Sequence, residues 1–380
     1  MTVSIWQADG TQPTREVDFL VIGAGIIGCA VAYFASQAGR KVTITEMRDV
    51  ALGASSRNAG FLITGLDEYY HHGKARWGDK SAKELWDITR RSLNMWRDFA
   101  KRGGDVQIEN TGSLLLSETP EEAKDLEAAA RAMEGDGLPV EYFSTDPLRR
   151  GYHNAIRQPE DGVVHPYQLA QSVLKQSGAE LIDNNEVYSI KQEGSVVKVH
   201  TRQFVLNARQ VMICTNAYSP YLHPYFVGKV IPVRAQCLVT EPIKEKILPS
   251  CCYSDYGYMY YRQTFDGRLL IGGARNLHRE LEHDTTDDRI TDPVQRSLEN
   301  YLRNRFPDVA ASIDRRWAGI MGFSVDGLPM VGTLPEMNNV GFAVGFTGHG
   351  LSTGAVVAER AVEMMISGAS PGIVDAARLR

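Results

Sequence analysis

The stretch from residue 18 to residue 46, DFLVIGAGIIGCAVAYFASQAGRKVTITE, constrains what this chain can fold into more than any other part of the sequence. An apolar run predicts a short strand, and three glycines with the spacing G-x-G-x-x-G open a helix that reaches to about residue 38. A second apolar run predicts another strand, which ends at a carboxylate, Glu46. Strand, glycine turn, helix and strand in this order predict a Rossmann-type unit that binds a dinucleotide.

Each residue of the turn has a physical role in holding such a ligand. Gly23 permits the tight turn, Gly25 lets the backbone approach a pyrophosphate, and Gly28 lets the helix pack closely on the strand. The free N–H groups at the helix N-terminus, at Ile26 and Ile27, then face the phosphates.

Glu46 lies where a dinucleotide site needs a carboxylate. It follows the glycines by roughly twenty residues, where it can accept hydrogen bonds from ribose hydroxyls and disfavours a 2′-phosphate.

The uncharged stretch of this unit allows two other interpretations. No charge lies between Asp18 and Arg40, so the stretch is long enough for a membrane span of roughly 20 residues. Glycines at its start and a β run on each side favour the nucleotide unit instead. A signal peptide is disfavoured because no basic segment leads directly into an apolar one.

The composition narrows the kind of partner. A chain of 380 residues exceeds the usual size of a single core, so two domains are expected, and 43% hydrophobic residues supply their cores. The formal net charge of -5 offers no basic field for nucleic acid or anionic lipid, so small molecules are the predicted partners. The 5 cysteines are scattered without a C-x-x-C pair, which indicates neither a disulfide framework nor a zinc site and predicts a cytoplasmic protein.

Two excursions separate three parts of α/β character. The first opens with an amphipathic helix over residues 81–102 and continues through a strand at 113–116 and a helix that starts after Pro120. The second contains a helix at 293–306 and three predicted strands, at 236–240, 257–262 and 269–271.

The predicted fold class is therefore α/β, with a Rossmann-like nucleotide-binding domain interrupted twice by a mixed α+β substrate domain. The nucleotide-binding domain is expected to take residues 1–80, 160–222 and 317–380. The substrate domain is expected to take residues 81–159 and 223–316.

A second strand, glycine turn and helix lies at residues 339–368 and changes the expected ligand. Gly345, Gly348 and Gly350 place another helix N-terminus where it can face an electron-rich group. FAD has both a pyrophosphate and a ring that becomes negative on reduction, so it can use both helices, whereas NAD does not need the second. The alternative is that these glycines only turn a strand into a packing helix.

A further segment is expected to wrap around the ligand. In LGASSRNAGFLITG, at residues 52–65, the small and hydroxyl-bearing residues and the single charge favour a backbone that contacts a ligand.

Seven motifs in order resemble one family. They are the nucleotide unit, GASSRNAGF at 53–61, ARQVMICTNAYS at 208–219, PVRAQ at 232–236, DGRLLIGG at 266–273, WAGIMGFSVDGLPMVG at 317–332 and GFTGHG at 345–350. With them, the chain resembles the FAD-dependent amine and amino-acid oxidoreductases related to D-amino acid oxidase, glycine oxidase and monomeric sarcosine oxidase. SSRN followed by a small residue and Gly is most similar to the gamma-glutamylputrescine oxidoreductase branch.

This resemblance implies oxidation of the carbon–nitrogen bond of an amine by hydride transfer to flavin N5, giving an imine that water hydrolyses. The implied flavin contacts lie in the nucleotide unit, the loop after it, two separate positions and the second glycine turn. They are Gly23, Gly25, Ile26, Ile27, Gly28, Glu46, Ser55, Ser56, Arg57, Asn58, Ala59, Gly60, Phe61, Val187, Thr215, Gly348, His349, Gly350, Leu351 and Ser352.

Five family positions carry other residues here. The arginine that binds the substrate carboxylate in glycine oxidase is replaced by Met321, and the arginine and lysine of sarcosine oxidase are replaced by Ile63 and Ser352. An unpaired buried carboxylate is unfavourable, so a small α-amino acid bound in the familial manner is disfavoured. Gly319 stands at the covalent-flavin cysteine, which implies noncovalent FAD. Leu270 stands at the oxygen-activating lysine, which leaves the electron acceptor open.

A tyrosine-rich strand is the predicted substrate wall. Tyr258, Tyr260 and Arg262 share one face at period two, and Tyr260 falls near the family's substrate-facing tyrosine. Aromatic faces suit a substrate with a cationic remainder, and Arg262 could accept a distal carboxylate. Together with Phe61 and Met321, these are the expected substrate-binding residues. The alternative is that the tyrosines only pack in a half-buried strand.

No catalytic residue and no metal ligand are assigned. His349 is expected to serve the turn, adjacent His71 and His72 are not expected to share one helical face, and HRELEHD at 278–284 is expected to be a solvated loop. Three alternatives stay open: an oxidase or dehydrogenase of D-amino acids, glycine or N-methyl amino acids; a flavin-carrying electron-relay subunit of a multi-subunit dehydrogenase; and a nicotinamide dehydrogenase. A homo-oligomer and a redox partner are left open as well.

Overall fold

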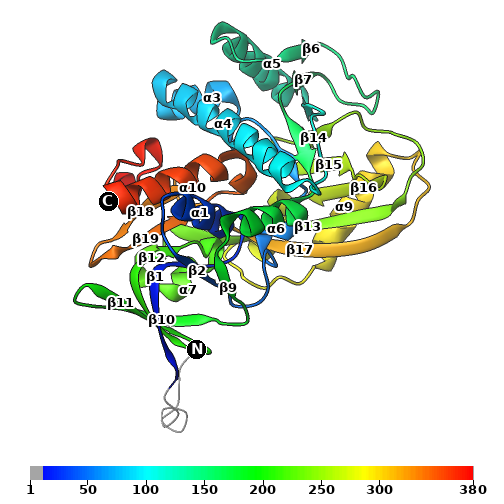
Figure 1. Ribbon diagram of the computed structural model, residues 1–380. Helices are drawn as coiled ribbons and strands as arrows, with labels where there is room; N and C mark the ends of the chain where they lie inside the picture. Colours follow the sequence, from blue (N-terminus) through cyan, green and yellow to red (C-terminus); the bar gives the residue numbers. More distant parts are fainter. Residues whose placement is uncertain (1–11, 380) are drawn as a thin grey trace.

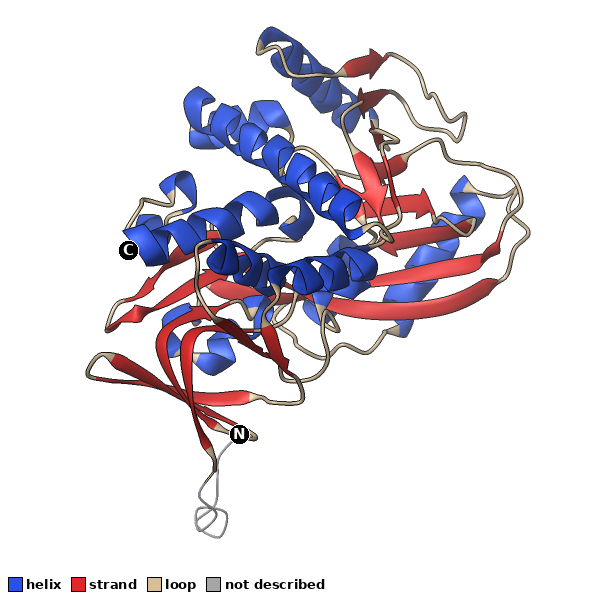
Figure 2. Cartoon of the chain, in the orientation of Figure 1, coloured by secondary structure: helices blue, strands red, loops and turns tan. Residues whose placement is uncertain are grey.

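The computed structural model describes residues 12–379. The strands gather into two large sheets, with a layer of helices over the first and further helices against the second (Figures 1 and 2). Among residues 12–379, no helix combines the length and the apolar character needed to cross a membrane.

The first sheet has eight strands and carries the predicted Rossmann unit at its centre. Its strands are β1 (Thr14–Ile22), β2 (Val42–Thr45), β9 (Glu180–Ile182), β10 (Val187–Glu193), β11 (Val196–Thr201), β12 (Val205–Ile213), β18 (Met330–Leu334) and β19 (Met337–Val344). β1 lies parallel to β2 and β12, and the parallel pairing continues to β9 on one side and β19 on the other. The pair β10 and β11 and the strand β18 add antiparallel edges.

Helices packed over this sheet are positioned by two glycines. The helices are α1 (Ile26–Gln37), α4 (Asp79–Gly103), α6 (Pro166–Ser177) and α10 (Gly350–Ser367). α1 passes so closely over the end of β1 that a Cβ on Gly28 would lie 1.9 Å from the carbonyl oxygen of Gly23. α10 lies against α1 where a Cβ on Gly354 would lie 2.5 Å from Cδ1 of Ile27. These two close approaches fix where both helices begin.

The long helix α4 forms as its apolar spacing predicts. Its stripe of large apolar side chains is buried: Leu85, Trp86, Ile88, Leu93, Trp96 and Phe99. Burying each such side chain contributes about 1.5–3 kcal/mol. The indole Nε1 of Trp96 also donates a hydrogen bond of 2.7 Å to the carbonyl oxygen of Leu351, which ties α4 to the first turn of α10.

The second sheet also has eight strands, in the order β17-β13-β16-β15-β14-β5-β7-β6. Its strands are β5 (Ser113–Leu116), β6 (Glu141–Phe143), β7 (Ala155–Gln158), β13 (Val230–Pro242), β14 (Cys251–Ser254), β15 (Met259–Gln263), β16 (Arg268–Gly273) and β17 (Ile313–Ser324). The long strands β13 and β17 pair antiparallel along most of their length, and the helix α9 (Asp292–Arg305) packs against β13 and β16. A small sheet of β3 (Phe61–Leu62), β8 (Gly162–Val164) and β4 (Ile108–Glu109) completes the pairing.

Five shorter or outlying helices complete the fold. They are α2 (Ala54–Arg57), α3 (Tyr70–Trp77), α5 (Pro120–Gly135), α7 (Ser219–Leu222) and α8 (Arg279–Glu282). In Figure 1, α3 and α5 stand with β6 and β7 at the end of the molecule away from the β10–β11 ribbon.

The α/β fold class is confirmed, since the two sheets interleave along the chain. The first sheet takes its strands from residues 14–45, 180–213 and 330–344, and the second from 113–158 and 230–324. The predicted boundary after residue 316 falls inside β17, all of which belongs to the second sheet. The division of the chain into domains stays a prediction.

Two local predictions are corrected by long-range contacts. The strand expected from residue 257 begins at Met259, because Asp255 and Tyr256 have positive φ values of 51° and 52° and form a turn. The HRELEHD segment is not a solvated loop throughout, since Glu282 is buried and pairs with Arg234 at 2.8 Å. That arginine lies on β13, so the local charge pattern gave no sign of it.

Substituting Gly28 by Ala should destabilise the fold. The added Cβ meets a backbone carbonyl, which cannot move aside cheaply, so overpacking is expected to lower the unfolding free energy by about 3 kcal/mol. Gly135→Ala at the end of α5, where an added Cβ meets nothing within 4 Å, is the matched control and should change stability by less than about 1 kcal/mol. Thermal unfolding measures both, and equal melting temperatures for the two variants would contradict the close-packing argument.

Candidate functional site

One large cavity connects the two sheets. It has a volume of about 1040 Å³, and its walls come from segments between residues 22 and 352. One end is formed by the turn after β1, the end of β2, the loop around α2 and the N-terminus of α10. The other end is formed mainly by aromatic residues of the second sheet and by the segment that follows β3. The two ends therefore differ in chemistry.

The glycine turn has the geometry of an anion cradle. Gly23 has a φ of 103°, which a residue with a side chain rarely adopts, and the first turn of α1 lines the cavity. The backbone N–H of Ile26 donates to Oγ of Ser55 at 2.9 Å. Because that hydroxyl accepts from the helix, its own proton remains available to donate to a ligand oxygen.

Glu46 is held at the end of β2 by backbone donors. Its Oε2 accepts from the N–H of Ala24 at 2.8 Å, and its Oε1 accepts from the N–H of Arg48 at 3.1 Å. A carboxylate oxygen can accept a second hydrogen bond, so the residue is positioned to accept hydroxyl groups as well.

The loop after the first Rossmann unit is fixed by its own side chains. Asn58 Nδ2 donates to the carbonyl oxygens of Ala54 and Ser55, and its Oδ1 accepts from the N–H of Gly60. Arg57 donates to Oδ2 of Asp288 at 2.6 Å, so its guanidinium is already paired. These bonds hold the loop in its conformation against the cavity.

A second helix N-terminus faces the same cavity. The first residues of α10 lie in the cavity wall, and Gly348 has a φ of 77° that turns the chain into the helix. The side-chain Oδ1 of Asn216 accepts from the N–H of Gly345 at 2.9 Å, which holds the turn from the side. His349 Nδ1 lies 3.0 Å from the carbonyl oxygen of Thr347, so this histidine serves the turn. Two helix dipoles therefore point at one cavity.

Most of the residues expected to contact the flavin line this cavity. They are Gly23, Gly25, Ile26, Ile27, Glu46, Ser55, Arg57, Asn58, Ala59, Phe61, Val187, Thr215, Gly348, His349, Gly350, Leu351 and Ser352. Gly28, Ser56 and Gly60 are not in the lining. Gly28 packs against the strand, and the N–H and carbonyl groups of Gly60 are bonded to Asn58 and Val164. Contact with the flavin was expected of these three residues, but they lie outside the cavity wall.

Aromatic side chains from three segments make the other end of the cavity. The rings of Phe61 and Tyr253 are 5.1 Å apart, and those of Phe61 and Tyr260 are 6.3 Å apart, both edge to face. Tyr258, Tyr260, Phe61 and Met321, all expected to contact substrate, lie in the lining. Burial raises the pKa of Tyr260 well above its ordinary value, so its hydroxyl stays neutral.

Arg262 does not fit its expected role. The alternating pattern put it on the face of Tyr260, yet it lies outside the cavity lining and is buried. Its Nη1 donates to the carbonyl oxygen of Gly60 at 3.1 Å and lies 3.3 Å from those of Ala59 and Val164. The loop that wraps the cavity covers this end of the strand, and Arg262 satisfies its carbonyl groups. Burial lowers the pKa of Arg262 to about 10, so it remains cationic at neutral pH.

Four of the five positions at which this chain departs from the family residues lie in the cavity wall. Ile63, Gly319, Met321 and Ser352 line the cavity, whereas Leu270 does not. Within residues 12–379 no lysine lines the cavity, and Arg275 is a lining arginine that the sequence patterns did not single out. Its only sign in the sequence was its place directly after the IGGA end of a strand.

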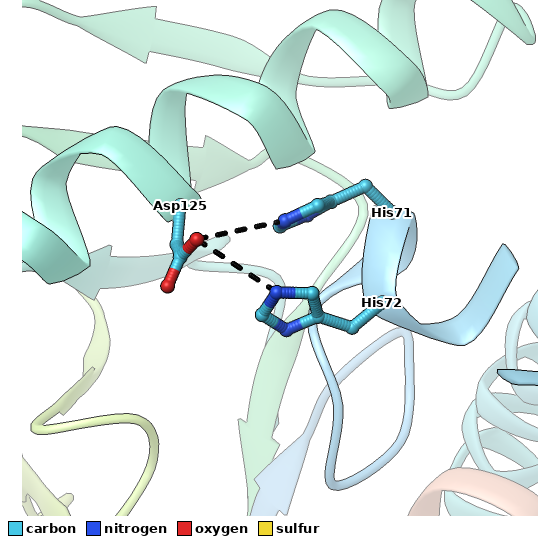
Figure 3. A group of neighbouring side chains, drawn as sticks. All are labelled: His71, His72 and Asp125. Carbon is cyan, nitrogen blue, oxygen red and sulfur yellow. Dashed lines mark ion pairs between the residues drawn. The ribbon is translucent and has the colours of Figure 1, made fainter. Parts of the chain in front are cut away.

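Two adjacent histidines meet one carboxylate, against expectation. Nε2 of His71 and Nε2 of His72 lie 3.8 and 3.7 Å from Oδ1 of Asp125 (Figure 3). Both rings reach the carboxylate because they stand at the start of α3, where α5 approaches, and their ring centroids are 4.0 Å apart. Burial and the neighbouring His72 lower the pKa of His71. The contacts link α3 to α5 beside the cavity.

Comparisons with known proteins identify the family. The family described as "DAO: FAD dependent oxidoreductase" matches residues 18–364. The chain is 26% identical over 356 residues to "Probable oxidoreductase OrdL" of Rhizobium meliloti (strain 1021), covering 89% of this chain and 80% of that protein. It is 26% identical over 369 residues to glycine oxidase of Geobacillus kaustophilus (strain HTA426), covering 91% and 93%. A crystal structure of glycine oxidase from Geobacillus kaustophilus matches with a TM-score of 0.77, over 93% of this chain and 95% of that one.

A further relative is larger than this chain. It is the 4-methylaminobutanoate oxidase (formaldehyde-forming) of Paenarthrobacter nicotinovorans, 24% identical over 409 residues that span 99% of this chain and 47% of that protein. Because the family pattern covers residues 18–364, almost the whole described sequence, this chain belongs to the DAO family of FAD-dependent oxidoreductases.

Proposed function

We propose that this chain oxidises the carbon–nitrogen bond of an amine to an imine, using FAD held noncovalently in the cavity. The observation that carries the proposal is the continuity of the cavity, which joins a dinucleotide cradle at one end to an aromatic chamber at the other. A ligand that spans both ends must have a nucleotide part and a reactive part, and the substrate must then meet the reactive part inside the aromatic chamber.

The chain's own groups fit FAD. The first turn of α1 and the hydroxyl of Ser55 would hold the pyrophosphate, and Glu46 would accept the ribose hydroxyls. The N-terminus of α10 would stabilise negative charge on the ring system, since helix N-termini favour anions. Gly319 offers no thiol for a covalent bond, and its missing side chain makes room for Arg57, whose Cβ would lie 3.0 Å from a Cβ there.

The bound flavin supplies the acceptor for a hydride from the carbon next to nitrogen, and the imine is then hydrolysed by water. The protein contributes positioning and desolvation. Phe61, Tyr253 and Tyr260 surround the substrate end with ring faces that exclude water and can face a cationic remainder of the substrate. We assign no side chain as the base.

The substrate class follows from the departures from the family. Ile63, Met321 and Ser352 leave the three familial carboxylate positions without a cation. Glycine oxidase acts on an α-amino acid, whereas the 4-methylaminobutanoate oxidase acts, by its name, on an amine whose carboxylate is remote from nitrogen. We infer that amines of the second kind, or amines without a carboxylate, suit this cavity better than small α-amino acids.

Noncovalent attachment predicts complete release of the flavin. Because Gly319 replaces the covalent cysteine, precipitating the purified yellow protein with acid should leave all the flavin in the supernatant, where chromatography should identify it as FAD. Flavin that stays with the precipitated protein would contradict the assignment.

Gly25→Val should abolish retention of FAD. A Cβ at this position already lies 3.0 Å from Oγ of Ser55, so the branched side chain must displace that hydroxyl and enter the pyrophosphate path. We expect FAD binding to weaken by at least about tenfold, measured by fluorescence titration of apoprotein. Gly135→Val, in open space, controls for the added bulk, and normal FAD occupancy in Gly25→Val would show that the cradle is misplaced.

Amines should reduce the flavin faster than small amino acids. In anaerobic stopped-flow experiments, secondary and primary amines, with or without a remote carboxylate, are expected to exceed glycine, sarcosine and D-alanine by at least about tenfold, the usual value of a missing charge-assisted contact. A faster rate with sarcosine or D-alanine than with every amine would refute the inference from the missing anchors. If dithionite reduces the flavin but no amine or amino acid does, the electron-relay alternative is favoured.

A further inference from the structure

Arg275 is a cationic side chain in the cavity wall with few hydrogen-bonding or ionic partners. It follows β16, its side chain is 14% exposed, and it lines the cavity. Its guanidinium carbon lies 4.7 Å above the ring of Tyr258 and 5.8 Å from that of Phe323. Asp67 is its ionic contact, at 3.8 Å from Nη2. Across residues 12–379 the guanidinium donates no hydrogen bond, so its five N–H groups are unfulfilled.

The other arginines near the cavity are already engaged. Arg57 donates to Asp288 and to the carbonyl oxygen of Ala318, and Arg262 donates to backbone carbonyls behind the wall. Arg48 lies at the nucleotide end, where its Nη1 is 3.6 Å from Oδ2 of Asp288. Arg275 is therefore the arginine at the aromatic end whose donors remain free.

Its position places it at the substrate end. Burial is the main cause that raises the pKa of Tyr260, and the positive charge of Arg275 opposes this rise, so the guanidinium acts on the tyrosine that faces the cavity. The guanidinium lies beside the rings of Tyr258 and Phe323, which offer it no hydrogen-bond acceptor oxygen or nitrogen. A planar fork with free edge donors matches a carboxylate in two parallel hydrogen bonds.

We propose that Arg275 binds a carboxylate carried by the amine substrate, and that it selects substrates whose carboxylate is separated from the reacting nitrogen by a chain. This rests on the proposed amine oxidation. The three vacant familial positions lie on β17, after β3 and on α10, whereas Arg275 enters from the segment after β16. The carboxylate therefore binds at a different wall from the one used for α-amino acids. Asp67 keeps the cation partly paired until the substrate arrives.

A series of N-methyl amines tests this assignment. Sarcosine, N-methyl-β-alanine, 4-methylaminobutanoate and the uncharged N-methylbutylamine differ in the presence and distance of the carboxylate. Each is measured by anaerobic flavin reduction with wild type, Arg275→Met and Arg275→Lys. A carboxylate substrate longer than sarcosine should be fastest in wild type. Arg275→Met should lower kcat/KM for that substrate by about 10- to 100-fold and leave N-methylbutylamine nearly unchanged.

Arg275→Lys should recover part of the lost rate, because it keeps the charge and loses the fork. Arg279→Met is the matched control, since Arg279 lies four residues on, is exposed and is outside the cavity lining. Bound FAD and the melting temperature are recorded for every variant, so a failure to fold is recognised, and Arg275→Lys then carries the comparison.

Binding without turnover gives a second measurement. Titration of the oxidised holoenzyme with butanoate, a carboxylate without an amine, should perturb the flavin absorption spectrum, and Arg275→Met should weaken that binding by about 10- to 100-fold while Arg279→Met does not. Equal butanoate affinity and an equal ratio of carboxylate to uncharged substrate in Arg275→Met and wild type would overturn the assignment. If amines with and without a carboxylate all fail to reduce the flavin while butanoate binding still depends on Arg275, the proposed oxidation is wrong and the anion site stands.

Discussion

The approach of α1 to the end of β1 determines where the cavity can be. Gly28 brings the helix so close to the carbonyl of Gly23 that no side chain fits between them, and this sets the direction in which the first helical N–H groups point. The next residue toward the N-terminus of the helix, Ile27, is the one that meets Gly354 of α10. The position of the second helix thus depends on the first. Two helix N-termini from distant parts of the chain converge on one cavity because three small residues permit two close approaches.

Arginines have two different roles at this site: two of them stabilise its structure, and a third is available to a ligand. Arg57 and Arg262 tie the loop that wraps the cavity to its surroundings by donating hydrogen bonds to backbone carbonyls. A guanidinium suits this task because it offers several donors in a plane and stays charged when partly buried. Arg275 has the same chemistry and lies in the cavity wall. The three side chains differ in function because their surroundings differ in how many acceptors they provide.

The sequence predicted the parts of the site that depend on local patterns. The two glycine turns were recognisable because each reflects a backbone conformation that few residues allow, and Glu46 followed from its place at the end of the second strand. Arg262 was misplaced because a loop from another segment covers its strand. The left-handed turn at Asp255 and Tyr256, the burial of Glu282 and the meeting of His71 and His72 at Asp125 all depend on contacts between distant segments. Alternation and charge patterns carry no information about such contacts.

The interleaving of the two sheets has a consequence for how the protein is made. The first wall of the cavity is synthesised at the beginning of the chain, and the last wall, at the start of α10, emerges only after every strand of both sheets. A nascent chain on the ribosome would hold the phosphate cradle without the helix that faces the rest of the cofactor. β1 could pair with β2 at once, but its second parallel partner, β12, would be made much later. The whole cavity therefore exists only once the start of α10 has been made, and FAD would act as a late ligand that stabilises chains in which both helix N-termini are in place.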